Sequence, residues 1–254
     1  MQHAKENGNN KWQEAIDREL SGVDQYETFE DLGHRDHINP PRGHQRIKLM
    51  WTFAVKHDGR FKARLCARGD MTEEPIESVY AGGVSIRGIR LVMFLAELND
   101  LDCWAADVSQ AYLTSYTTEK VYIVAGPEFG ERENHILVIR KALYGLRASG
   151  KNYGDLFSEF MYKMGFTPCV AEPDIWLRPN EELDCYEYVA CYVDDLAIAM
   201  SEPAAFIKRM KDEFHLEFKG DGPMKYHLGM DVGKDDEGTM YIEARKYVEK
   251  MSSN

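Results

Sequence analysis

Two neighbouring stretches of the chain alternate apolar and polar residues with a period of two, the pattern of β-strands with one buried face. They cover residues 48–56 and 61–67. The tetrapeptide between them, residues 57–60, contains Asp58 and Gly59, a residue pair that favours the tight turn of a hairpin. The pattern therefore predicts a β-hairpin in this part of the chain.

Other stretches repeat apolar residues every three or four positions, the spacing of one face of an α-helix. Helices are predicted at residues 11–20, 85–99 and 153–164, in a segment opened by Pro203, and at residues 245–254. Ser85 is placed to cap the second helix, while Gly22 and Gly165 are placed to end the first and the third.

Short apolar runs between these helices predict the remaining strands. They lie at residues 103–108, 120–125, 135–140, 173–178, 186–193 and 196–200, and residues 224–232 and 239–244 are expected to close the sheet. The polar stretch that follows the first helix and contains Pro40 and Pro41 is expected to be irregular. The middle of the chain reads β-α-β-β-α-β, which predicts an α+β fold with helices covering one face of an antiparallel sheet. Many unrelated proteins share that arrangement, so it identifies no function.

The composition is that of a soluble globular protein. The chain has 254 residues, of which 44% are hydrophobic and 29% charged, enough for one large domain or two lobes. Apolar runs such as residues 91–96 are too short to cross a bilayer, and the N-terminus lacks a signal pattern, so an intracellular location is expected. The five cysteines form no C-x-x-C pair, which argues against a disulfide framework and a structural zinc site.

The charge is unevenly distributed along the chain. The net charge is -12, yet residues 42–68 hold eight basic residues and a single acidic one, a local charge of +7. Lys62, Arg64 and Arg68 alternate along the second strand of the hairpin, so they share one face and could grip a triphosphate. A solvated hairpin with alternating cations explains the same composition equally well.

Three aspartates lie at the ends of apolar strands. Asp194 and Asp195 are set between residues 188–191 and 196–200, and Asp107 follows residues 103–106. The Asp-Asp pair taken alone is more simply explained as a solvated turn, because such turns are common. If all three carboxylates meet, they could hold two divalent cations roughly 3.5 to 4 Å apart, the arrangement that phosphoryl transfer to a hydroxyl uses.

Eight segments give the chain a family resemblance. They are KWQEAIDREL (from Lys11), WTFAVKHDGRFKARLCARG (from Trp51), SIRGIRLVMFLA (from Ser85), AADVSQAYL (from Ala105), KALYGLRASG (from Lys141), YVDDLAIAM (from Tyr192), YHLGMDV (from Tyr226) and RKYVEKM (from Arg245). In this order they resemble the reverse transcriptase of copia-type LTR retrotransposons. Gly150, where the family usually has proline, is a departure that removes no reactive group.

The resemblance implies the fingers and palm of a right-hand polymerase, with an antiparallel palm sheet backed by helices and a truncated thumb. The implied divisions are residues 1–45 for an N-terminal helix and irregular lead-in, and 46–102 for the fingers. Residues 103–240 would form the palm, with a fingers insertion near 126–150, and residues 241–254 the start of the thumb.

The resemblance also implies roles for individual residues. Asp107, Asp194 and Asp195 would be the catalytic, metal-binding triad, with Asp195 the least directly engaged, and the Val108 backbone carbonyl would add a ligand to two Mg²⁺ or Mn²⁺ ions. The residues implied around the incoming dNTP are Lys62, Arg64, Val108, Ser109, Gln110, Ala111, Tyr112, Tyr144 and Gly145, and those of the primer grip are Leu228 and Gly229. The Tyr112 ring would exclude a ribose 2′-hydroxyl, although a tyrosine of the core is the commoner use of this residue type.

The expected function is RNA-directed DNA polymerase, a nucleotidyltransferase. Its expected partners are an RNA or DNA template with a primer, dNTPs and no membrane, in the cytoplasm or within virus-like particles. The integrase, protease and RNase H portions of the polyprotein are expected but absent from this sequence. One alternative is a non-catalytic nucleic-acid-binding remnant that lacks thumb and RNase H. Another is a palm-type metal phosphotransferase such as a nucleotide cyclase, which leaves Tyr112 and residues 142–146 unexplained.

Overall fold

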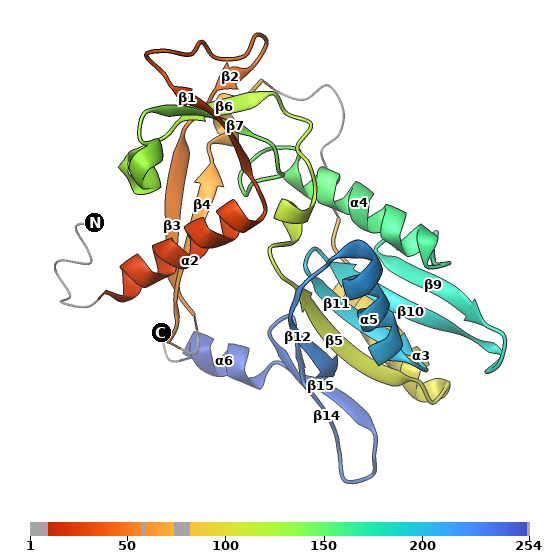
Figure 1. Cartoon of the computed structure of the whole chain (residues 1–254). Coiled ribbons are helices and arrows are strands. Elements are labelled where there is room, and N and C mark those ends of the chain that lie inside the picture. Colours follow the sequence, from red (N-terminus) through yellow and green to blue (C-terminus); the bar gives the residue numbers. More distant parts are fainter. Residues whose placement is uncertain (1–9, 57–58, 74–81, 253–254) are drawn as a thin grey trace. The chain divides into compact units, whose positions relative to one another are not determined.

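The computed structural model describes residues 10–56, 59–73 and 82–252 and divides the chain into two compact units (Figure 1). Unit 1 consists of Met1–Tyr80 and Tyr112–Asp155, and unit 2 consists of Ala81–Ala111 and Leu156–Asn254. Each unit has its own cluster of buried apolar side chains.

Unit 1 contains a helix, a four-stranded sheet and a two-stranded hairpin. Its elements are α2 (Lys11–Gln25), β1 (Phe29–His34), β2 (Gln45–Arg46), β3 (Leu49–Val55), β4 (Phe61–Ala67), η1 (Gly69–Met71), η2 (Ala111–Thr114), β6 (Val121–Val124), η3 (Pro127–Arg132), β7 (His135–Ile139) and the start of α4 (Ser149–Lys163). The sheet has the order β1-β7-β6-β2, and β3 pairs with β4 as the predicted hairpin. The predicted turn at His57 and Asp58 lies outside the described residues.

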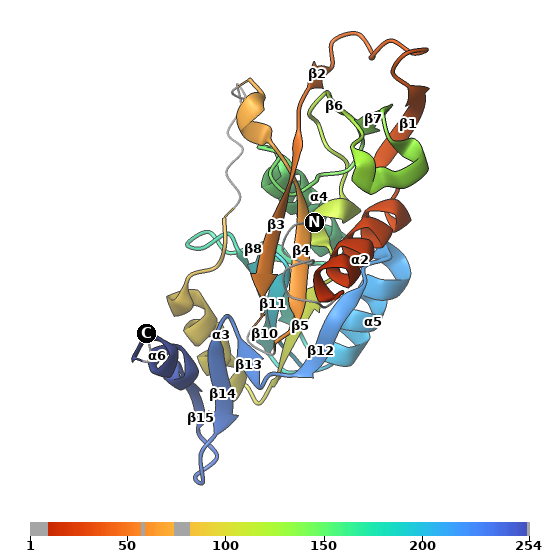
Figure 2. The ribbon, with the colours of Figure 1, turned by 90° about the vertical axis from the view of Figure 1, so that its left-hand side faces the viewer.

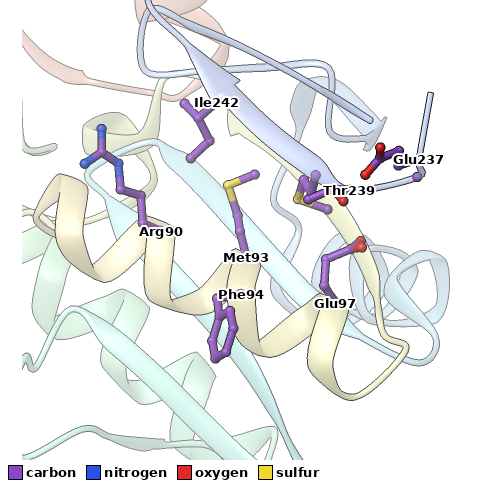
Figure 3. A pocket seen from close by; sticks show the side chains of 9 residues that line it. Arg90, Met93, Phe94, Glu97, Glu237, Thr239 and Ile242 are labelled. Carbon is purple, nitrogen blue, oxygen red and sulfur yellow. The ribbon is translucent and has the colours of Figure 1, made fainter. Parts of the chain in front are cut away.

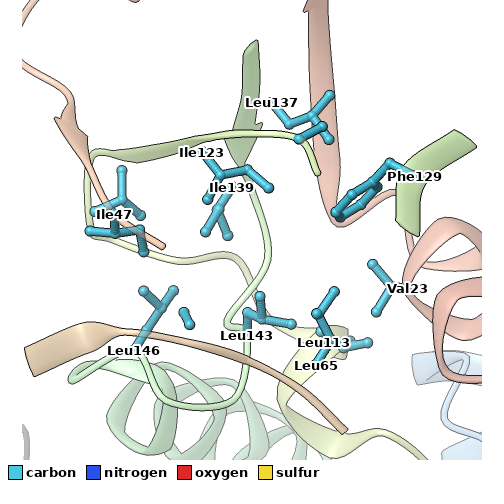
Figure 4. Packing of buried hydrophobic residues seen from close by; sticks show 13 residues of the cluster. Val23, Ile47, Leu65, Leu113, Ile123, Phe129, Leu137, Ile139, Leu143 and Leu146 are labelled. Atoms are coloured by element: carbon cyan, nitrogen blue, oxygen red, sulfur yellow. The ribbon is translucent and has the colours of Figure 1, made fainter. Parts of the chain in front are cut away.

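The core of unit 1 joins the hairpin to the sheet. Leu65 of β4, Leu137 of β7 and Leu143 are fully buried in one cluster, which Figure 4 shows together with Ile47 and Phe129. Removing such apolar surface from water is the main stabilising contribution to a fold of this size. One face of β4 therefore packs in the core, and the alternate residues of this strand lie on its other face.

Unit 2 is built on a six-stranded antiparallel sheet. The elements are α3 (Ile86–Leu98), β5 (Asp102–Val108), β8 (Thr167–Pro168), β9 (Ile175–Asn180), β10 (Cys185–Tyr192), β11 (Asp195–Met200), α5 (Pro203–Phe214), β12 (Phe218–Pro223), β13 (Tyr226–His227), β14 (Met230–Lys234), β15 (Met240–Glu243) and α6 (Arg245–Ser252). The order of the large sheet is β12-β5-β11-β10-β9-β8, and β13, β14 and β15 form a separate sheet.

Helices cover both faces of the large sheet, so the prediction of one covered face is wrong. Figures 1 and 2 show α3 on one side of the sheet and α5 on the other. On the α3 side, the small Ala197 and Ala199 side chains of β11 share a buried cluster with Val92 of α3. The alternate residues of β11, Leu196 and Ile198, are fully buried on the opposite face.

Local signals predicted most elements, with three corrections. Helix α3 begins as predicted, since the Ser85 side chain accepts a hydrogen bond of 3.0 Å from Gly88 N. Helix α2 does not end at Gly22 but continues to Gln25, because burial of Gly22 and Val23 outweighs the cost of one glycine, about 1 kcal/mol. Strand β1 lies in the stretch predicted to be irregular, where it pairs with β7.

The third correction concerns the edge of the large sheet. Residues 224–232 and 239–244 were expected to close it, but they contribute to the separate β13-β14-β15 sheet. The edge strand is instead β12, whose sequence FKGDGP has a low strand propensity. None of the helices that the structure describes is long and apolar enough to cross a membrane.

Candidate active site

Asp107 and Asp195 are direct cross-strand partners on β5 and β11. Residues directly opposite in an antiparallel pair point to the same face, with Cβ atoms about 4.5–5.5 Å apart. Asp195 opens β11, and Asp107 lies next to the end of β5. The structure therefore brings together two carboxylates that are 88 positions apart in the sequence, as their places at strand ends predicted.

Asp194 lies in the tight turn between β10 and β11. Tyr192 pairs with Asp195, so the turn consists of Val193 and Asp194. Val193 has a φ of +58°, which is unfavourable for a β-branched side chain and is normally reserved for glycine at the first position of such a turn. Val108 N donates a hydrogen bond of 2.8 Å to Asp194 O, which ties the turn to the end of β5. Strain of this kind is common at functional sites, where surrounding contacts maintain it.

The Asp107 side chain is partly exposed, but one of its two carboxylate oxygens is buried. The side chain is 40% exposed, yet its Oδ1 atom is shielded from solvent and accepts no hydrogen bond from the described residues. The Nζ atom of Lys219, on β12, lies 3.7 Å from this oxygen. Nothing in the sequence pattern singles out Lys219, because it lies in the glycine-rich strand β12, whose sequence carries no strand signal.

The donor chemistry at this strand edge fits a hard divalent cation, because carboxylate oxygens are the ligands such ions prefer. An Asp107 oxygen that is buried without a hydrogen-bond donor supports that fit. As the side chains stand, however, no three His, Cys, Asp or Glu groups in residues 10–56, 59–73 and 82–252 are gathered closely enough to hold a metal ion. Binding by the three aspartates would therefore require their side chains to rotate toward one another.

The residues that follow Asp107 form a compact bend. Val108 is fully buried, and Ser109 N donates a hydrogen bond of 2.7 Å to Glu217 O. Gln110 has a φ of +47°, and its Oε1 atom is buried without a hydrogen-bond partner among the described residues. Ala111, at the start of η2, is almost fully buried. The residues expected to border a nucleotide thus include a second orphaned acceptor near the aspartates.

In unit 1, the predicted cationic face of β4 is confirmed for Lys62 and Arg64, whereas Arg68 lies just beyond the strand and its side chain pairs with Asp70. Lys62 and Arg64 pair with Ala54 and Thr52 of β3, while the intervening Ala63 is buried. Arg64 also lies over an aromatic ring, with its guanidinium carbon 4.8 Å from the centroid of Tyr144. That distance is within the range of a cation-π interaction.

Tyr144 lies between Arg64 and Tyr112. The ring centroids of Tyr112 and Tyr144 are 5.1 Å apart, and Tyr153 of α4 meets Tyr112 edge-on at 6.1 Å. We call Arg64, Tyr144, Tyr112 and Tyr153 the tyrosine stack. Contacts at these spacings favour a fixed ring orientation. The stack links the cationic face of β4 to Tyr112, the residue for which the family resemblance implies a role in sugar discrimination.

Backbone contacts at Tyr144 and Gly145 hold the tyrosine stack against β4. Ala67 N donates a hydrogen bond of 2.6 Å to Tyr144 O. Gly145 has a φ of +89°, and a Cβ atom there would lie 2.2 Å from Ala67 O. Only glycine satisfies both the conformation and the close approach. The presence of glycine after Tyr144 therefore has a structural explanation that does not depend on any ligand.

Leu228 and Gly229 form the turn between β13 and β14, where His227 pairs with Met230. Both turn residues have positive φ, +46° and +85°, as in the tight turns that favour glycine. His227 is buried, and burial lowers the pKa of its imidazole to about 4. Its Nε2 atom has no hydrogen-bond partner in the part of the chain that the structure describes. The side chain is therefore neutral at pH 7.

Two hollows lie elsewhere on the molecule. One, of about 590 Å³, lies between α3 and β15 in unit 2, where Figure 3 shows Met93, Phe94 and Ile242 among its lining residues. The other, of about 480 Å³, lies in unit 1 around Tyr116 and Arg140. Neither is lined by a residue that the sequence predicted for the site.

Comparison with known proteins identifies a family and several relatives that this chain resembles. A family model described as "Reverse transcriptase (RNA-dependent DNA polymerase)" matches residues 35–254. The retrovirus-related Pol polyprotein from transposon TNT 1-94 of Nicotiana tabacum is 25% identical over 240 residues, which is 90% of this chain and 18% of that protein.

Two further relatives come from a plant and a yeast. The retrovirus-related Pol polyprotein from transposon RE1 of Arabidopsis thaliana is 25% identical over 250 residues, 94% of this chain and 16% of that protein. The transposon Ty1-LR2 Gag-Pol polyprotein of Saccharomyces cerevisiae is 29% identical over 160 residues, 60% of this chain and 9% of that protein. The chain thus spans less than a fifth of the length of these relatives.

Proposed function

This chain belongs to the reverse transcriptase (RNA-dependent DNA polymerase) family, of the copia type, and we propose on that premise that it adds deoxynucleotides to a primer 3′-hydroxyl on an RNA template. One observation carries the proposal. Asp107 and Asp195 face each other across β5 and β11, next to the strained turn that holds Asp194. A solvated turn explains the Asp-Asp pair alone but gives no reason for a third carboxylate on the neighbouring strand.

The three aspartates, with the backbone carbonyl of Val108, would hold two divalent ions, Mg²⁺ or Mn²⁺. When bound, such ions supply Lewis-acid chemistry, which makes the primer hydroxyl a better nucleophile and stabilises the pyrophosphate that leaves. The chain itself keeps the carboxylates adjacent. The hydrogen bond from Val108 N to Asp194 O keeps the turn beside Asp107.

Other residues would bind the nucleotide and the primer. Lys62 and Arg64 would bind the triphosphate, since cations on one strand face can contact several phosphate oxygens. The residues that would line the rest of the nucleotide site are Ser109, Gln110, Ala111, Tyr112, Tyr144 and Gly145. Leu228 and Gly229 would hold the primer end. The Tyr112 ring would exclude the 2′-hydroxyl of a ribonucleotide sterically.

We assign the six-stranded sheet of unit 2 to the palm and the β3-β4 hairpin of unit 1 to the fingers. The partners would be an RNA or DNA template with its primer and dNTPs. The Pol polyproteins that resemble the chain are far longer, and we propose that integrase and RNase H portions act with it. Its place would be inside the cell, with virus-like particles as one setting.

Primer extension tests the proposal. The full chain is incubated with an RNA template, a DNA primer, dNTPs and either Mg²⁺ or Mn²⁺, in parallel with Asp194→Asn. We expect metal-dependent extension by the wild type and none by the variant, with both proteins binding the primer-template equally. Binding without extension by the wild type would instead support the non-catalytic remnant.

A further inference from the structure

Lys219 occupies an irregular position beside Asp107. Strand β12 pairs with β5, but the register shifts between Phe218, opposite Val108, and Gly220, opposite Asp107. Lys219 is therefore the extra residue at this irregularity. Such bulges redirect a side chain out of the regular alternation of a strand. Here the redirected ammonium group lies 3.7 Å from Asp107 Oδ1.

The Asp107 oxygen needs a compensating positive charge. It is shielded from solvent and receives no hydrogen bond from the residues described. A buried carboxylate oxygen without a donor or a cation is costly. Asp195 lies directly opposite on β11, which adds a second carboxylate next to the first. A positive charge at this point offsets the cost of burying the oxygen and the repulsion between the two acids.

We propose that Lys219 is the counter-ion of Asp107 in the metal-free protein and that it competes with divalent cations for this carboxylate. The inference rests on the proposed function, in which Asp107 is a metal ligand. It makes Lys219 a positioning residue that keeps Asp107 oriented and sets how tightly a metal ion binds. Lys219 is 47% exposed, so its flexible stem can swing the ammonium into water when another cation arrives.

The same strand supplies a matched control. Lys211 of α5 pairs with Asp221 of β12, with Nζ and Oδ2 2.9 Å apart. The Lys211 side chain is 43% exposed, similar to Lys219. Replacing either lysine by glutamine removes one positive charge from an ion pair at the same sheet edge. Only the Lys219 change removes it from an oxygen of Asp107.

The test is the affinity for Mn²⁺, measured by electron paramagnetic resonance of the free ion with the full chain and no nucleic acid. The variants are Lys219→Gln, Lys219→Arg, Lys211→Gln and Asp107→Asn. At a separation of 3.7 Å we expect Lys219→Gln to bind Mn²⁺ about 3- to 10-fold more tightly than the wild type. Lys219→Arg and Lys211→Gln should keep the wild-type affinity, and Asp107→Asn should lose the site.

Thermal unfolding supplies a second readout that does not require polymerase activity. Without metal, the Lys219→Gln variant has no counter-ion for Asp107, so Mn²⁺ should raise the unfolding temperature of this variant more than that of the wild type. Equal Mn²⁺ affinity in Lys219→Gln and the wild type, with weaker binding by Asp107→Asn, would overturn the role of Lys219 and leave the metal site intact. Mn²⁺ binding that Asp107→Asn does not change would overturn the metal site and this inference together.

Discussion

Val193 shows how a single residue can carry strain beside the aspartates. Its φ of +58° costs a β-branched residue roughly 1–2 kcal/mol, whereas glycine adopts it freely. We expect Val193→Gly to raise the free energy of unfolding by about 1 kcal/mol after allowing for the more flexible unfolded chain. Urea unfolding at pH 7 measures this change. The free energy of unfolding should rise less in Val193→Ala than in Val193→Gly, because alanine keeps the unfavourable φ. Equal stability of the wild type and both variants would contradict strain at this turn.

The tyrosine stack gives a second prediction at the residue scale. Tyr112→Ala should increase incorporation of ribonucleotides relative to deoxynucleotides, because the ring that would exclude the 2′-hydroxyl is removed. Tyr144→Leu should loosen the same discrimination, since Tyr112 loses the ring 5.1 Å away that fixes its orientation. Tyr144→Phe keeps the ring and is the control. The measurement is the ratio of kcat/KM for dNTP and rNTP, and an unchanged ratio in Tyr112→Ala would refute a steric role.

At the scale of the elements, the contact between β4 and the loop after β7 depends on Gly145. A Cβ atom at this position would lie 2.2 Å from Ala67 O, in a backbone conformation with φ of +89°. We expect Gly145→Ala to destabilise the fold by roughly 2–4 kcal/mol. Chemical unfolding provides the measurement.

Gly154 is the matched control for this substitution. It lies inside α4, and a Cβ atom there would meet nothing within 4 Å. Alanine favours the helix interior, so Gly154→Ala should stabilise by up to about 1 kcal/mol. If both substitutions changed stability equally, the close approach of Gly145 to β4 would not explain the need for glycine.

Elements with strong periodic signals were predictable, and those shaped by tertiary contacts were not. The hairpin β3-β4 and the capped helix α3 follow from alternation and from Ser85. Strand β12 was missed because its two glycines and a proline give it no strand signal, and only its pairing with β5 makes it extended. The position of Lys219 beside Asp107 was unpredictable for the same reason, because Lys219 lies on β12.

The sequence contains a signal for helices on both sheet faces. Residues 196–200 are apolar at every position, the pattern of a strand buried on both sides rather than of one with a solvated face. Large and small residues alternate there, and the small ones, Ala197 and Ala199, face α3. The meeting of Asp107 with the Asp194 turn was predictable from strand ends. The clustering of Arg64, Tyr144 and Tyr112 was implied only by the family resemblance, because no local pattern connects three distant segments.

At the scale of the whole molecule, stability should depend on pH through His227. Burial lowers its pKa from an ordinary 6.5 to about 4, so the unfolded chain binds a proton at a higher pH than the folded one. Stability is fully present above pH 6.5 and falls as the pH drops toward 4. Between pH 7 and pH 5 we expect a loss of about 2 kcal/mol from this group.

Urea unfolding at these two pH values measures the loss, and His227→Gln serves as the control because its side chain does not titrate. The difference between pH 7 and pH 5 should be smaller in the variant by about the same 2 kcal/mol. A variant with the wild-type pH dependence would show that His227 does not cause it.

The central claim is that Asp107 acts with the Asp194-Asp195 turn in nucleotide transfer. Strand β5 offers a matched pair of substitutions, because Asp107 lies by the turn and Asp102 is an exposed residue at the opposite end of the same strand. Single-nucleotide incorporation into a primed RNA template, under saturating dNTP and Mg²⁺, compares Asp107→Asn with Asp102→Asn. We predict that Asp107→Asn lowers the rate by a factor on the order of 10³ or more while Asp102→Asn keeps the wild-type rate. A folded Asp107→Asn that incorporates nucleotides as fast as the wild type would contradict the account.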